Sequence, residues 1–132
     1  MNRKLAKMTK SLDFNAGTQI ETISAASEQL MIDFPDDYVE FMISKNGGEG
    51  FVGESYLVLW KAEDLQSLNE AYEMREFFPG LVAFGSDGGG DGYAFQKTNG
   101  QTAIVQFPFI GLQSDITYLA KNFTSFIETL IA

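Results

Sequence analysis

The stretch AFGSDGGGDGYAFQ, residues 83–96, places a glycine-rich segment between two runs of apolar residues. Between positions 85 and 92 the sequence has five glycines, one serine and two aspartates, Asp87 and Asp91. Glycine supplies positive φ values and permits close backbone approach, and aspartate accepts hydrogen bonds from the N–H groups of a turn. This composition predicts a turn between two strands, with Asp87 and Asp91 bonding to its backbone.

Three other roles of this loop are compatible with the sequence. Loops that cradle phosphate normally lead into a helix and carry Lys or Ser/Thr, whereas this loop leads into the strand-like YAFQ. Calcium takes about 6–8 oxygen ligands, and the loop supplies two carboxylates. A surface for a protein partner needs neither feature. We therefore expect no metal and no other cofactor, and keep Asp87 and Asp91 as candidate contacts to a protein.

The segment PDDYVEFMISKNGG, residues 35–48, predicts a helix from its start, its face and its end. Pro35 suits the first helical position, and Asp36 and Asp37 would then lie in the first turn, where the helix dipole favours acids. Gly47 can adopt the left-handed conformation that ends a helix. The apolar face follows i, i+3, i+4 spacing at Tyr38, Phe41 and Met42.

The remaining segments alternate between helical and strand-like patterns. Helices are predicted over 18–31, with Thr18 as N-cap, after Asp64, and along the apolar stripe from Ile116 to Leu130. Strands are predicted over 56–60, 81–84, 93–96 and 103–107, the last two joined by the tight-turn pair Asn99-Gly100. This order indicates an α+β fold, in which a mainly antiparallel sheet packs with N-terminal helices and a C-terminal helix.

Composition limits the function classes. The chain has 132 residues, 45% of them apolar, which suits a single domain with a substantial core. It contains no cysteine and no histidine, so a Ser-His-Asp or Cys-His nucleophile and a zinc site with His or Cys ligands are excluded. We expect that the protein is not an enzyme and has no catalytic residues. A carboxylate-based enzyme or a metal-binding protein is a lesser alternative.

The net charge of −9 is unevenly distributed. The first ten residues hold four of the nine basic residues, Arg3, Lys4, Lys7 and Lys10, and no acidic one. The rest of the chain has five basic residues against eighteen acidic ones, which repels nucleic acid and anionic membranes and attracts a basic protein. Residues 1–17 lack the apolar run of a signal peptide. We expect a cytoplasmic protein with a flexible basic segment over 1–17 and one domain over 18–132.

Three segments, taken in order, resemble the SUKH superfamily, which is named after a fungal cell-wall-synthesis regulator. They are the helix that opens after an apolar residue and proline and stops at Asn-Gly-Gly, the glycine loop between apolar strands, and a closing Phe-x-x-Phe-Ile helix. The resemblance covers about residues 18–131. The matching residues are Phe34, Pro35, Asp37, Tyr38, Phe41, Asn46, Gly47 and Gly48, then Phe84, Gly85, Asp87, Gly88, Gly89, Asp91 and 93–95, then Phe123, Phe126 and Ile127.

Most bacterial members of this superfamily look like immunity proteins, which bind and neutralise a toxin, commonly a nuclease, without catalysing a reaction. The resemblance therefore implies a non-catalytic protein-binding domain. The acidic charge suggests a basic toxin domain as the partner, because the two surfaces would attract each other. The superfamily also includes general interaction and regulatory modules related to the cell-wall-synthesis regulator, and this is the alternative function.

Two acid–aromatic groups are candidate contacts to the partner. Aromatic residues surrounded by charges are typical of interface hot spots, although the same aromatics can equally belong to the core and the acids to solvated loops. The candidates are Glu49, Phe51, Glu54 and Tyr56 from one segment and Asp87, Asp91 and Tyr93 from the other. Structural roles are implied by the resemblance for Pro35, Tyr38, Asn46, Gly47, Gly48, Gly85, Gly88 and Gly89.

Overall fold

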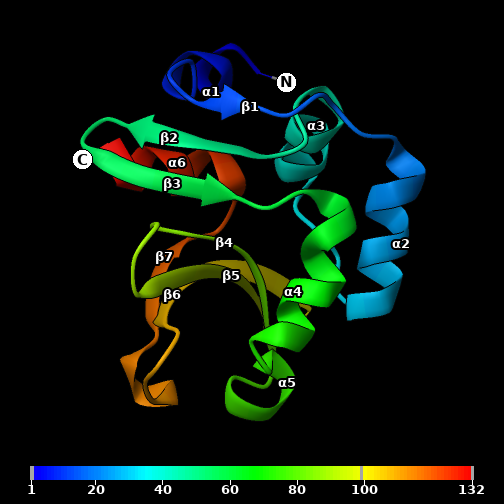
Figure 1. Cartoon of the computed structure of the whole chain (residues 1–132), viewed down its shortest axis with the longest axis vertical. Helices are drawn as coiled ribbons and strands as arrows, with labels where there is room; N and C mark the ends of the chain where they lie inside the picture. Colours follow the sequence, from blue (N-terminus) through cyan, green and yellow to red (C-terminus); the bar gives the residue numbers. More distant parts are fainter. Residues whose placement is uncertain (1, 99, 132) are drawn as a thin grey trace.

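The computed structural model describes residues 2–98 and 100–131, which contain six α-helices and seven strands (Figure 1). Within this described part, no helix is long and apolar enough to cross a membrane. The α-helices are α1 (Arg3–Met8), α2 (Ile20–Leu30), α3 (Asp36–Ser44), α4 (Leu65–Ala71), α5 (Met74–Phe77) and α6 (Phe123–Ile131). The strands are β1 (Asp13–Phe14), β2 (Gly48–Val52), β3 (Ser55–Leu59), β4 (Leu81–Ser86), β5 (Asp91–Thr98), β6 (Gln101–Pro108) and β7 (Thr117–Ala120).

The seven strands form one antiparallel sheet in which spatial order follows chain order. This confirms the predicted α+β fold class. The glycine loop joins β4 to β5, so the predicted turn between two strands is confirmed. Strands β5 and β6 pair as the expected hairpin, while Asn99 of the predicted tight turn lies outside the described residues.

The strand pairing of the sheet is short between β3 and β4. These strands pair at only two positions, one of which places Leu59 opposite Gly85. Further along β4, helix α4 takes the place of a strand. The side-chain amide of Asn69 donates to the carbonyl oxygen of Ala83 (2.9 Å), and its oxygen accepts from the Ala83 N–H (2.8 Å). Asn69 is buried, and its amide therefore satisfies backbone groups that β3 leaves unpaired.

Helices α3 and α6 pack on one face of the sheet around Tyr38, which is 1% exposed. Its ring contacts the rings of Phe34, Phe84, Phe95 and Phe123 at centroid distances of 4.9–5.7 Å. The Tyr38 hydroxyl has no hydrogen-bond partner among the described residues. Burial raises the pKa of this hydroxyl above the value of free tyrosine, because the charged form loses its hydration.

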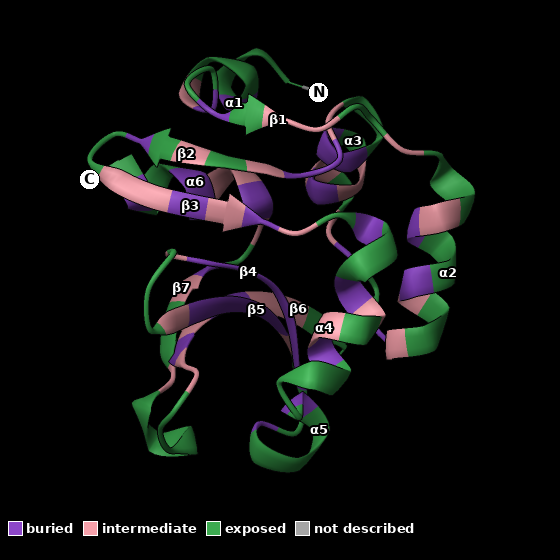
Figure 2. Ribbon diagram, in the orientation of Figure 1, coloured by how far each residue is buried: buried purple, intermediate pink, exposed green. Residues whose placement is uncertain are grey.

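The opposite face of the sheet is covered over β4–β6 only. There Met74 and Phe78 pack against Ala83 and Phe107 in a second apolar cluster. On β2 and β3, the side chains that point toward this face are exposed or half-buried, as the alternating colours of the hairpin in Figure 2 show. The sheet is thus buried on both sides at one end and open on one side at the other, which provides a surface for a site.

Several local predictions need correction. Helix α3 begins at Asp36, so Pro35 is its N-cap and not its first helical residue. Gly47 has the predicted positive φ of 79°, but the helix has already ended at Ser44. Helix α2 begins at Ile20, and its N-cap is Gln19 and not Thr18. The apolar face of Tyr38, Phe41 and Met42 is confirmed as buried core.

Asp37 lies in the first turn of α3, as predicted, and has a further role that the sequence did not indicate. Its carboxylate accepts hydrogen bonds from the backbone N–H of Phe123 (3.1 Å) and from the N–H (2.7 Å) and hydroxyl (2.8 Å) of Thr124. These groups lie at the beginning of α6, where free N–H donors need acceptors. Asp37 therefore caps the C-terminal helix and ties α3 to it.

Two segments form strands where other structure was predicted. Residues 48–52 form β2, a strand that the sequence did not predict. Residues 117–120 form β7, and α6 starts only at Phe123, so the predicted closing helix from Ile116 is wrong over its first part. Apolar residues three or four apart suit a helix, but over so short a segment they also suit a strand followed by a turn.

The N-terminal segment differs from the flexible chain that we expected over 1–17. Helix α1 packs on α6 with Leu5 fully buried, and Lys4 forms an ion pair with Glu128 (3.0 Å). Asn2 caps α1 by accepting from the Leu5 N–H (2.7 Å). Strand β1 then pairs with β2, which places Asp13 on the sheet.

Candidate partner-binding site on the open face of the sheet

The uncovered end of the sheet carries acidic and aromatic side chains together. Asp13 of β1 lies opposite Glu49 of β2, and Phe51 of β2 lies opposite Tyr56 of β3. Directly opposed residues share a face, and so do residues two apart in one strand. All four side chains therefore point to the same side, and we call Asp13, Glu49, Phe51 and Tyr56 the acidic face.

Contacts within the acidic face hold its side chains in place. The Tyr56 hydroxyl donates to a carboxylate oxygen of Glu49 (2.6 Å), and this bond is the main reason why the pKa of Tyr56 is raised. The rings of Phe51 and Tyr56 meet edge to face at 5.1 Å. Phe51 remains 56% exposed. An open hollow of about 750 Å³, lined by all four residues, lies over these strands.

The electrostatics of this surface are unfavourable for the isolated protein. Asp13 and Glu49 are both exposed, and their like charges face each other across the β1–β2 pair. Such pairs destabilise a sheet. Among the described residues the one ion pair joins Lys4 to Glu128, so within this part of the chain no basic group forms an ion pair with either acid. The acidic face therefore presents negative charge outward.

The glycine loop borders the acidic face at Tyr56. Asp87 accepts from the backbone N–H of Gly89 (2.8 Å) and, at longer range, of Asp91 (3.3 Å), as its predicted turn role requires. Gly88 has a φ of 81°, and a Cβ there would lie 2.9 Å from the Tyr56 ring. Only glycine combines this conformation with so close an approach. Asp87 and Tyr56 accordingly line one shared hollow.

The remaining candidates are Tyr93, Asp91 and Glu54. Tyr93 lines the same hollow as Tyr56 and Asp87, but it is 3% exposed and packs against the Phe126 ring at 4.9 Å, so it belongs mainly to the core. Burial, with the charges of Asp87 and Asp91 adding to it, raises the pKa of Tyr93 to about 12. Asp91 was expected to bond to the backbone of the turn, but its carboxylate accepts from the side-chain amide of Gln106 (2.9 Å). Glu54 is exposed in the turn between β2 and β3.

Comparison with protein families identifies the family of the chain. The sequence model of the SMI1 / KNR4 family (SUKH-1) matches residues 17–129. The chain belongs to this SUKH-1 family. No curated protein matches the sequence at a significant level. The match spans the three segments whose resemblance to the superfamily was noted from the sequence.

In this SUKH-1 protein the Asn-Gly-Gly segment joins three parts of the chain. The side chain of Asn46 accepts from the Ala62 N–H (2.9 Å) and donates to a Glu63 carboxylate oxygen (2.6 Å), which fixes the start of the short 3-10 turn Ala62–Asp64. A Cβ on Gly47 would lie 2.6 Å from the carbonyl oxygen of Leu59. The segment therefore holds the β3–α4 connection and does not itself end α3.

Three further glycines, for which the resemblance implied structural roles, differ in how tightly they are enclosed. Gly48 and Gly85 lie against neighbouring backbone, at Asp13 and Val58 respectively. Gly89 has only ordinary van der Waals contact and lies in the exposed loop.

Sequence reasoning missed one member of the acidic face, Asp13. It fell in a segment expected to be flexible, and the signal for it was weak, since β1 has only two residues. Within the described part of the chain, no three His, Cys, Asp or Glu side chains converge as ligands of a metal would. Asp87 and Asp91 face backbone and amide donors.

Proposed function

We propose that this SUKH-1 protein is a cytoplasmic immunity protein that neutralises a basic toxin domain, such as that of a nuclease, by binding it with the acidic face. The observation that carries the proposal is the opposition of Asp13 and Glu49 on an uncovered part of the sheet. This arrangement is unfavourable for folding alone. It becomes favourable when a cationic surface covers it.

The aromatic residues of the acidic face would supply the anchor. Phe51 is exposed, and its edge-to-face contact with Tyr56 limits the side-chain freedom that binding would otherwise have to remove. The hydrogen bond from Tyr56 to Glu49 acts in the same way. Preformed aromatic side chains surrounded by charges are typical of the residues that dominate binding energy.

The net charge would act before contact is made. A nuclease domain holds phosphates and is usually basic, and an acidic inhibitor that meets this surface excludes the nucleic acid. The charge of −9 would raise the association rate and would make that rate dependent on salt.

The proposal can be tested by affinity capture from the native cell, followed by measurement of association rates with the captured protein. The test variant is Asp13→Asn with Glu49→Gln, which keeps the side-chain shapes and leaves an acceptor for Tyr56. The matched control is Glu21→Gln with Glu28→Gln on α2, which removes the same charge from exposed positions elsewhere.

We expect the wild type and the control to capture the same basic toxin domain, with association that slows as salt is added. The test variant should associate about tenfold more slowly at low salt. Unchanged association of this variant would reject the acidic face as the binding surface. Capture of a housekeeping protein in place of a toxin would support the regulatory alternative.

A further inference from the structure

We propose that the groove bounded by the end of α2, helices α4 and α5, and the start of β4 binds a small apolar molecule that carries one anionic group. The groove has a volume of about 520 Å³, within the usual range for small-molecule sites. Its apolar lining includes Leu30, Met31, Ile32, Met74, Leu81 and Val82. None of these residues belongs to the acidic face, so this inference is independent of the proposed function.

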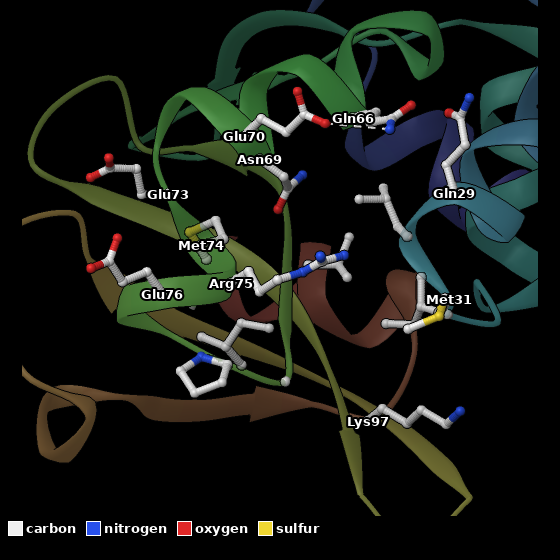
Figure 3. Close-up of a pocket in the computed structure, with 16 residues that line it drawn as sticks. Gln29, Met31, Gln66, Asn69, Glu70, Glu73, Met74, Arg75, Glu76 and Lys97 are labelled. Carbon is white, nitrogen blue, oxygen red and sulfur yellow. Dashed lines mark hydrogen bonds between the residues drawn. The ribbon is translucent and has the colours of Figure 1, made fainter.

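Positive charge in the groove indicates the sign of the ligand. Only five basic residues follow position 10, and two of them, Arg75 and Lys97, line this groove. Within the described part of the chain neither forms an ion pair. Figure 3 shows the Arg75 guanidinium pointing into the middle of the groove, with Lys97 on another side. Arg75 is exposed, and a guanidinium at this position can bind an anionic group through paired N–H donors.

The acidic residues in the lining of the groove lie away from the Arg75 guanidinium. In Figure 3 the carboxylates of Glu73 and Glu76 lie at the outer side of the groove, away from the Arg75 guanidinium. Glu70 accepts from the side-chain amide of Gln66 on the same helix (3.4 Å). The lining holds three glutamates against two cations, and the charged group that points into the middle of the groove in Figure 3 is the Arg75 guanidinium.

Two helix ends also border the groove. Met31, the C-cap of α2, and Glu73, between α4 and α5, are the non-glycine residues with positive φ in the described part of the chain, at 54° and 53°, and both line this groove. Helices commonly end at a left-handed residue, so the helix ends account for this conformation. Met31 is 74% exposed, and Figure 3 places it across the groove from Met74. Two flexible thioether side chains can adapt to an apolar ligand between them.

The test uses two fluorescent dyes, the anionic anilinonaphthalene sulfonate and the uncharged phenylnaphthylamine, titrated into the folded full-length protein. Backbone amide shifts measured by NMR locate each dye. The charge variant is Arg75→Gln with Lys97→Gln. Its matched control is Lys61→Gln with Lys121→Gln, which removes two exposed cations outside the groove. A second variant, Met31→Gly, relieves the positive φ and removes the apolar wall.

We expect both dyes to shift amides around Met31 and Val82. The charge variant should bind the anionic dye about tenfold more weakly and the uncharged dye as before, because two exposed cations are lost. Met31→Gly should weaken both dyes without lowering the melting temperature. The proposal is overturned if the anionic dye does not bind the groove, if the charge variant binds it as the wild type does, or if both dyes weaken equally in that variant.

Discussion

The two faces of the β2–β3 hairpin differ in burial and in charge. Val52 and Leu57 are fully buried against α6 and the core, whereas Phe51, between them in the pairing, is 56% exposed. Alternation of side chains across a strand lets one hairpin contribute to the core with one face and present charge with the other. The difference teaches that stability and binding can be changed separately here, by substitutions at adjacent positions.

The largest expected effect is the difference in lost stability between substitutions on the two faces. Leu57→Ala should lower the free energy of unfolding by about 3 kcal/mol, because it leaves a cavity in a fully buried site. Phe51→Ala on the other face should lower it by less than about 0.5 kcal/mol. Chemical denaturation of both variants measures the contrast. A loss of similar size for Phe51→Ala would mean that the open face is covered in solution.

The second prediction compares two adjacent acids of α3. Asp37 is hydrogen-bonded to the start of α6, whereas Asp36 is exposed. Asp37→Ala should cost about 2 kcal/mol, since three donors at the start of α6 lose a charged acceptor. Asp36→Ala removes only a favourable interaction with the helix dipole and should cost about 0.3–0.5 kcal/mol. Equal losses in thermal unfolding would contradict the capping role of Asp37.

The third prediction concerns a substitution that should stabilise the protein. Tyr38→Phe should raise the free energy of unfolding by about 1 kcal/mol, because it removes a buried hydroxyl that has no partner among the described residues. The ring contacts remain. Tyr56→Phe serves as the comparison on the open face, where the hydroxyl is bonded to Glu49. If Tyr38→Phe destabilises the protein, then the hydroxyl is hydrogen-bonded in solution.

The smallest expected effect concerns the stability that the protein loses because like charges oppose each other on the acidic face. Asp13→Asn should stabilise the protein by a few tenths of a kcal/mol at low salt, since it removes a like charge opposite Glu49. The gain should disappear at high salt, where exposed charges are screened. Denaturation at two salt concentrations measures it. A loss of stability at low salt would show that Asp13 has a favourable partner.

Sequence patterns correctly predicted those elements in which all local signals favour the same structure. Helix α3 has an acidic start and an apolar face at Tyr38, Phe41 and Met42, and the glycine loop has residues suited to a turn between strands. Strand β2 was missed because two of its five residues are glycine, which disfavours strands in general. In β2 the glycines are needed for close approach, as at Gly48 beside Asp13.

Contacts between distant segments were beyond local patterns. Asp37 caps a helix 86 residues further along the chain, and nothing in its neighbourhood distinguishes this role from a place in its own first turn. The acidic face was predicted in part, through Glu49, Phe51 and Tyr56, whose spacing places them in one hairpin. Asp13 joins them only through tertiary pairing. Tyr93 was a candidate because it follows acids in sequence, and the strand turns it inward.

The sheet does not close on itself, and its two outermost strands have only two and four residues. Lateral addition of another polypeptide needs a row of free N–H and C=O groups, and strands this short provide little template for it. Growth of a cross-β fibril from either edge strand is therefore disfavoured. The chain should therefore tolerate accumulation to high concentration without forming fibrils.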